Sequence, residues 1–125
     1  MQPTHSISVD VDARFLHLTL AGFFDAEAVA RFMEDREAAH ASLGAANDHV
    51  TLCDVTNCKI QSKESFEQFR ALLMQRSRWG RRMAFVVPHG SLAALQVKRL
   101  VAERADLRVF NDSEEGRAWL LEAAA

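Results

Sequence analysis

Apolar and polar residues alternate along the first part of the chain, as they do in strands that have one buried face. Residues 6–11 and 14–21 each place an apolar side chain at every second position. Only Asp12 and Ala13 separate the two runs, so we expect an antiparallel hairpin. Gly22 closes its second strand.

The pattern then changes to the 3.6-residue period of an amphipathic helix. Asp25 is placed to cap the start of this helix, and its apolar stripe runs to Leu43 and ends at Gly44. Three further helices are predicted, each of them after a polar residue that can serve as its N-cap. These caps are Ser62, Ser91 and Asp112.

Short, continuous apolar runs between the helices predict buried strands. They cover residues 49–54, 83–87 and 107–110. The polar residues 55–61 follow the first of these strands and are predicted to form a loop. The helix after that loop is expected to end near Gly80.

The element order is therefore ββαβαβαβα. Because each strand after the hairpin is followed by a helix, neighbouring strands should be parallel and joined by right-handed crossovers. We expect one α/β domain over residues 1–125, with a mixed five-stranded sheet and helices mainly on one face. The uncovered face would be solvated or would dock a second subunit. The covered face would carry Leu16, Leu18, Leu20, Val50 and Leu52, and the other face Ser8, Asp10, Phe15, His17, Thr19, Thr51 and Arg108.

Composition and charge are those of a globular protein with an uneven distribution of charge along the chain. The chain is 49% hydrophobic and 26% charged, which is ordinary for a globular domain. Residues 1–58 carry 3 basic and 9 acidic side chains, a net −6, whereas residues 59–104 carry 10 basic and 3 acidic ones, a net +7. The basic part could face an anionic partner or a second copy of the chain, or could have no role once folded.

The location of the protein is also constrained by its sequence. No run of about 18 apolar residues is present, so no membrane span is expected. The first residues lack a basic region followed by an apolar core, so we expect no signal peptide and a cytoplasmic protein. Cys53 and Cys58 are then expected to be reduced thiols.

Three segments carry a resemblance to a known fold. They are Leu20-Ala21-Gly22 after the second strand, Leu52-Cys53-Asp54 at the end of the third, and residues 108–120. With the element order, they resemble the STAS fold of the anti-sigma-factor antagonists, and most closely the uncharacterised SpoIIAA-like family. This resemblance implies a non-enzymatic regulatory module that binds a protein partner, with a homodimer expected. The wider group includes the SEC14 lipid-transfer domain, which implies a small apolar or lipid-like ligand as the alternative.

The chain departs from the antagonists at one important point. Antagonists of the phospho-switch type carry an Asp-Ser-Ser/Thr-Gly signature just before the second helix, and its serine is phosphorylated. Here Asp54 is followed by Val-Thr-Asn-Cys. We therefore assign no phospho-acceptor, and interpret Thr56 as a partner of the loop backbone and Ser62 as a helix cap.

Catalytic and metal-binding patterns are absent from the sequence. The five histidines show no spacing of two, three or four residues with one another, so no metal site is predicted. Cys58 and His89 both follow parallel strands, but no nucleophile elbow or third catalytic residue accompanies them. The arginines within residues 76–82 are interleaved with one aromatic residue, Trp79, which argues against nucleic-acid binding. We predict neither an enzyme nor a cofactor.

The candidate binding residues follow the strands. An α/β domain usually binds its ligand or partner at the carboxyl ends of parallel strands. Phe23 is a further candidate there, for a partner surface or for a pocket between helix and sheet that Phe66 and Phe69 would also line. Packing in the core is the alternative role of Phe23. The complete set of candidates is Asp54, Thr56, Asn57, Ser62, His89, Ser91 and Phe23.

Overall fold

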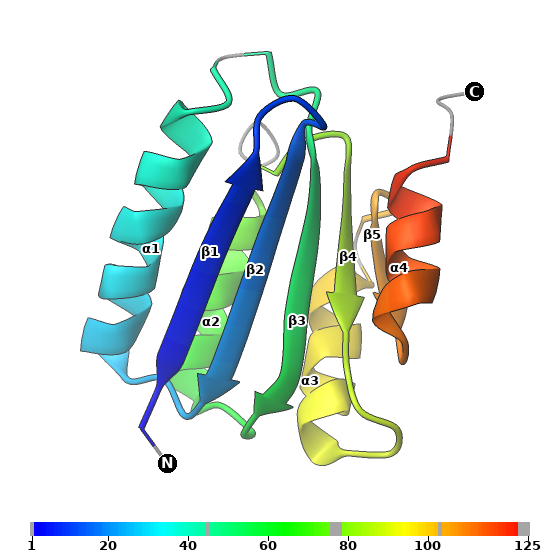
Figure 1. Ribbon diagram of the computed structural model, residues 1–125. Helices are drawn as coiled ribbons and strands as arrows, with labels where there is room; N and C mark the ends of the chain where they lie inside the picture. The colour runs from blue at the N-terminus through cyan, green and yellow to red at the C-terminus, as the bar shows by residue number, and fades with distance from the viewer. Residues whose placement is uncertain (1, 45, 76–78, 103, 123–125) are drawn as a thin grey trace.

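The computed structural model describes residues 2–44, 46–75, 79–102 and 104–122, and its elements follow the predicted order ββαβαβαβα (Figure 1). The five strands are β1 (Thr4–Asp10), β2 (Phe15–Gly22), β3 (Val50–Cys58), β4 (Arg82–Val86) and β5 (Leu107–Phe110). The four helices are α1 (Ala26–Ala41), α2 (Lys63–Leu73), α3 (Leu92–Val101) and α4 (Ser113–Leu120).

The strands lie in the sheet in the same order as in the chain, β1-β2-β3-β4-β5. β1 and β2 form the predicted antiparallel hairpin, and all other neighbours are parallel. Helices α1, α2 and α3 cover one face of the sheet, and α4 packs on the other face against β3, β4 and β5 (Figure 1). The mixed sheet with helices mainly on one face is confirmed.

The helices begin where polar side chains can satisfy free backbone N–H groups. Asp25 accepts a hydrogen bond from the amide of Ala28, and Ser62 accepts one from the amide of Ser65. Ser91 and Asp112 cap α3 and α4 in the same way. All four predicted caps are confirmed, because capping depends only on residues within one turn of the helix start.

The predicted assignment of β3 side chains to the two faces of the sheet is wrong. The register pairs Leu16 with Thr51 and Leu18 with Cys53, so Thr51 and Cys53 face α1–α3. Val50 and Leu52 point to the opposite face. β3 is buried on both faces at these positions, and an apolar run of this kind does not reveal which residue points which way.

The second face has a core of its own because α4 covers it. This core is built around Trp119 and Leu120 of α4, which are 6% and 0% exposed. No helix of the described residues covers the same face over β1 and β2, and its side chains there are polar or half-buried, apart from the buried Phe15. The strand residues of the second core are Phe15, Val50, Leu52, Ala84 and Val86, with Phe110 beside them.

Two predicted boundaries are also wrong. β3 continues through the polar residues to Cys58, because it stays paired with β2 as far as Gly22. α2 ends at Leu73 and not near Gly80. Gly80 instead has a φ of +80° and lies against the backbone of His49. Arg76 and Arg78 of the basic segment lie outside the described residues.

Candidate functional site

A β-bulge stands where the sequence predicts a loop. Thr19 of β2 pairs with Asp54 and Ala21 pairs with Asn57, so β3 holds one extra residue at this point. The Asp54 carboxylate accepts hydrogen bonds from the Thr56 amide at 2.9 Å and from the Thr56 hydroxyl at 2.6 Å. Asp54 and Thr56 thus stabilise the bulge together, and Asn57 follows them as an exposed residue.

Gln61 connects the loops at the carboxyl ends of the parallel strands. We call this end of the sheet the carboxyl edge. Its side-chain oxygen accepts a hydrogen bond from the Phe24 amide at 2.8 Å, and its Nε2 donates to the carbonyls of Gly22 at 3.0 Å and Lys59 at 2.6 Å. Its backbone amide donates to Oε1 of Gln96 at 2.7 Å, and Nε2 of Gln96 donates back to the Gln61 carbonyl at 3.0 Å. The β2–α1 loop, the β3–α2 loop and α3 are therefore fixed to one another.

Sequence reasoning missed both glutamines. They lie 35 residues apart, and neither belongs to a motif that marks a structural role. The hydroxyl of Ser65 adds a further buried contact, donating to the Phe24 carbonyl at 2.5 Å. Such contacts satisfy backbone groups of the loops, and they make the carboxyl edge a fixed rim.

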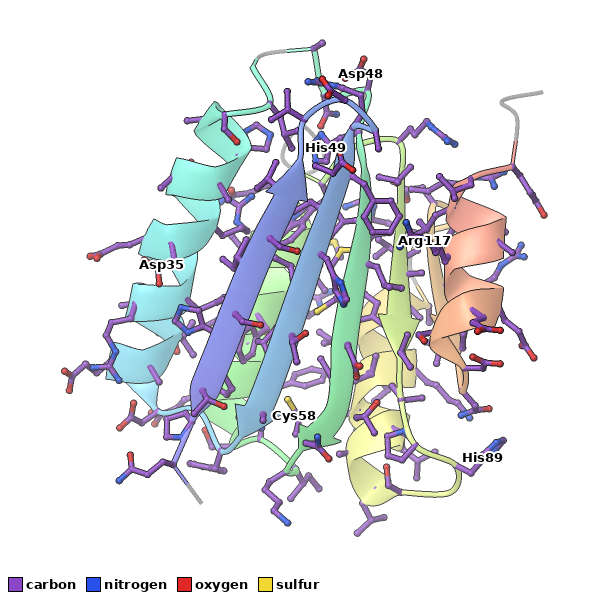
Figure 2. The ribbon with its side chains drawn as sticks, in the orientation of Figure 1. Asp35, Asp48, His49, Cys58, His89 and Arg117 are labelled. Atoms are coloured by element: carbon purple, nitrogen blue, oxygen red, sulfur yellow. The ribbon has the colours of Figure 1, made fainter. Side chains whose placement is uncertain are left out.

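The remaining predicted site residues are spread along this edge. Ser62 and Ser91 are occupied as caps of two different helices. His89 is exposed in the β4–α3 loop and lies well away from Cys58 (Figure 2). Within the described part of the chain, a hydrogen bond joins Asp54 and Thr56. Phe23 and Ser62 border one surface hollow.

Both cysteines are held as neutral thiols. Burial, with a smaller contribution from the Asp54 carboxylate, raises the pKa of Cys58 to about 12. Its Sγ donates to the Leu20 carbonyl at 3.3 Å. Burial also raises the pKa of Cys53 well above its usual value. A nucleophilic cysteine needs the thiolate, so neither residue is prepared for that chemistry.

An apolar cavity of about 80 Å³ lies between the sheet and helices α1–α3. Phe66 and Phe69 line it as predicted, but Phe23 does not; Phe24 takes its place. Phe23 is 42% exposed and borders a separate surface hollow with Asp25 and Glu64. The assignment of Phe23 to the pocket or the core is therefore wrong, because Phe24 packs inward and the side chain before it points out.

The cavity is almost entirely apolar. Its polar lining residues are Lys59, Gln61 and Gln96, all at the carboxyl edge. A dry cavity of roughly 150 Å³ can bind benzene, so the space here suits a smaller apolar group. No group of three or more histidine, cysteine, aspartate or glutamate residues that could hold a metal ion occurs among the described residues. In this part of the chain, no helix is long and apolar enough to cross a membrane.

A second cluster of polar side chains lies at the opposite edge, where Figure 2 shows Asp48 and His49. His49 is fully buried, and neither of its ring nitrogens has a hydrogen-bond partner among the residues that the structure describes. Its ring stands 5.4 Å from that of His40, and the buried guanidinium of Arg36 lies 4.5 Å from the Trp79 ring centre. Burial, and then the His40 charge, lower the pKa of His49 to about 4.

Solved structures that resemble this chain include two that match over almost its whole length. An uncharacterised protein of the DUF3478 family with a SpoIIAA-like fold, from Shewanella loihica PV-4, superimposes with a TM-score of 0.73 at 18% sequence identity, over 96% of this chain and 96% of that one. The chain has the SpoIIAA-like fold. An anti-sigma factor antagonist from Mycobacterium paratuberculosis matches with a TM-score of 0.67 at 10% identity, over 95% of this chain and 94% of that one.

These likenesses confirm the predicted fold. No protein-family model and no curated protein matches the sequence itself. At such low identity, the SpoIIAA-like fold is what the chain shares with both neighbours. A shared fold does not establish a shared function, so the role of the carboxyl edge depends on the residues that form it.

Proposed function

We propose that this chain is a non-enzymatic, STAS-like regulatory module that binds a protein partner through its carboxyl edge. The observation that carries the proposal is the fixed rim: Gln61 and Gln96 lock two loops and a helix into one surface. A rigid surface loses little conformational entropy when a partner binds. The exposed Asn57, His89 and Phe23 would make the contacts.

The likeness to an anti-sigma factor antagonist supports this proposal, since that protein is named for its action on another protein. The high pKa of the Cys58 thiol also supports it, because it argues against a cysteine enzyme. Thr56 is engaged with Asp54, and Ser62 caps α2. We propose that the module works without the phospho-acceptor serine of the phospho-switch antagonists.

The test compares variants of the rim in cells. Asn57→Arg with His89→Glu should abolish capture of a partner that wild-type protein retains, whereas Asp12→Arg, at the opposite edge, should not. Intact-mass measurement of protein isolated from the same cells should show no added phosphate. A phosphate that disappears in Thr56→Ala or Ser62→Ala would contradict the proposed mechanism.

We further propose that the protein is a cytoplasmic homodimer. The helix-free outer surface of β1 and β2 is the candidate contact, with Ser6 and Ser8 exposed on it. Native mass spectrometry at micromolar concentration should then show a dimer, and Ser6→Arg with Ser8→Arg should give a monomer. A monomeric wild type would refute the dimer and leave the partner proposal intact.

A small apolar ligand is the second candidate, and the cavity favours it. Its lining by Phe66 and Phe69 is what a SEC14-like carrier would need, although its volume suits only a small group. A ligand should be retained in native mass spectra of wild-type protein and lost in Ala93→Phe, which would fill the cavity at the N-terminal turn of α3. If the two proteins carry the same masses, the cavity is part of the packing and not a ligand site.

A further inference from the structure

The most exposed large apolar side chains of the described chain lie at the N-terminal turn of α3. Leu92 is 68% exposed and Leu95 is 54% exposed. Ile60 in the β3–α2 loop is 50% exposed, and the paired hydrogen bonds between Gln61 and Gln96 hold that loop against α3. Single exposed apolar residues are ordinary on a surface, but a group of this size at one edge indicates an interaction site.

Cations adjoin these apolar side chains. Lys98 and Arg99 are exposed on α3, and Lys59 is exposed next to Ile60. The described residues provide no ion-pair partner for any of the three. α3 itself, with the sequence LAALQVKRLV, contains no acidic residue. We call these six residues the basic-apolar patch: Lys59, Ile60, Leu92, Leu95, Lys98 and Arg99.

The helical geometry gathers the α3 part of the patch on one side. Successive residues of an α-helix are about 100° apart, so Leu92, Leu95, Lys98 and Arg99 fall within an arc of about 120°. Gln96 projects at the border of this arc, and its hydrogen bond to the Gln61 carbonyl holds the β3–α2 loop against α3. The exposed side of α3 therefore has an apolar N-terminal half and a cationic C-terminal half.

We propose that the basic-apolar patch docks the protein onto an anionic lipid surface. Leu92, Leu95 and Ile60 would enter the headgroup region, while Lys98 and Arg99 would contact lipid phosphates with their long side chains. The apolar residues project from a helix turn and a loop. A projecting patch of this kind can enter a lipid surface, whereas a partner helix would need a groove to lie in. This inference is independent of the proposed protein partner.

The position of the patch would also connect a membrane with the interior of the protein. Lys59, Gln96 and Val97 line the apolar cavity, and Lys59 belongs to the patch as well. An apolar group leaving the lipid would reach the cavity at this edge. Docking on the lipid surface does not require that a lipid group enter the cavity, and the docking and the entry can be measured separately.

Vesicle flotation tests the docking. Wild-type protein should float with vesicles of phosphatidylcholine and phosphatidylglycerol, and only weakly with phosphatidylcholine alone. Leu92→Ser with Leu95→Ser should lower the affinity roughly tenfold or more, because two apolar insertions are lost. Lys98→Gln with Arg99→Gln should lower it about thirtyfold at low salt, since each cation near an anionic surface contributes about a factor of five.

The matched control is Leu121→Ser. Leu121 is 52% exposed but follows α4, away from the patch, so this variant should bind vesicles like the wild type. Thermal melts should show that all variants remain folded, since the changes are on the surface. Failure of the wild type to float with the anionic vesicles would overturn the proposal, as would equal losses in Leu121→Ser. If the patch instead serves an acidic protein, vesicles of either composition will remain unbound.

Discussion

The environment of His49 in the folded protein differs strongly from its environment in the unfolded chain. Its ring is buried, and the charges of His40, Arg14 and Arg36 oppose its protonation. The folded protein thus holds it neutral down to a pH of about 4, whereas the unfolded chain takes up the proton near the ordinary value of 6.5. The stability that depends on neutral His49 is therefore fully present above pH 6.5. It is lost progressively as the pH falls from 6.5 to 4, because the unfolded chain binds the proton and the folded protein does not.

We predict that the free energy of unfolding drops across this range by an amount on the order of 1 to 3 kcal/mol attributable to His49. The comparison is with His49→Leu, which cannot titrate. Urea unfolding of both proteins at several pH values between 7 and 4.5 measures the difference. Parallel pH profiles for the two proteins would show that the ring is already solvated in the folded state.

Gly80 is a position where the backbone allows no side chain. A Cβ built there would stand 2.0 Å from the carbonyl oxygen of His49, and φ is +80°. Gly44 has a similar φ of +77°, but no atom of the described residues lies within 4 Å of its Cβ position. Substituting alanine at Gly44 would test the cost of the backbone conformation alone. At Gly80 the same substitution would add the cost of a steric clash.

We predict that Gly80→Ala destabilises the protein by more than about 3 kcal/mol, and Gly44→Ala by only about 1 kcal/mol. Urea midpoints of the two variants and the wild type provide the test. Equal shifts would mean that the β3 and β4 backbones separate easily to admit the methyl group.

At the scale of elements, Gln61 links parts of the chain that share no strand pairing. Replacing it with alanine would leave the Phe24 amide and the Gly22 and Lys59 carbonyls without its hydrogen bonds. We predict a loss of about 1 to 3 kcal/mol and faster hydrogen exchange at the Phe24 amide.

Gln68→Ala serves as the control for this change, because Gln68 is exposed on α2. It should leave both the urea midpoint and the exchange rate at Phe24 unchanged. Slow exchange of Phe24 in Gln61→Ala would show that the β2–α1 loop is held by other contacts, and would weaken the argument for a fixed rim.

The elements that sequence alone predicts well are those with local causes. The hairpin follows from alternation and a two-residue turn, and the caps follow from single side chains next to apolar stripes. The faces of β3 could not be predicted, because Val50 to Cys53 are buried whichever way they point. The extension of β3 depends on its pairing with β2, and the rim depends on contacts between residues 35 or more positions apart.

At the scale of the whole molecule, the last helix, α4, packs against the three strands β3, β4 and β5. The guanidinium groups of Arg82 and Arg108 lie 4.7 and 4.8 Å from the centre of the Trp119 ring. Its ring also stands 5.7 Å from that of Phe110. Trp119 therefore connects α4 to side chains of both β4 and β5.

We predict that Trp119→Ala costs about 3 to 5 kcal/mol and exposes the second face to hydrophobic dyes. Thermal unfolding and dye binding measure both effects. Trp119→Phe keeps an aromatic ring in place and should recover most of the stability. Dye binding that stays at the wild-type level in Trp119→Ala would show that α4 is held mainly by its other contacts, such as those of Leu120.

The order of the strands in the sheet has a consequence for the growing chain. Because β1 to β5 are added in the order in which they are synthesised, each new strand finds its neighbour already in place. The first core can close as α1, α2 and α3 appear in turn, but the second face waits for α4. Until the ribosome releases that helix, Val50, Leu52 and Val86 have no cover, so the interval before the last helix emerges is when the nascent protein is most exposed to aggregation.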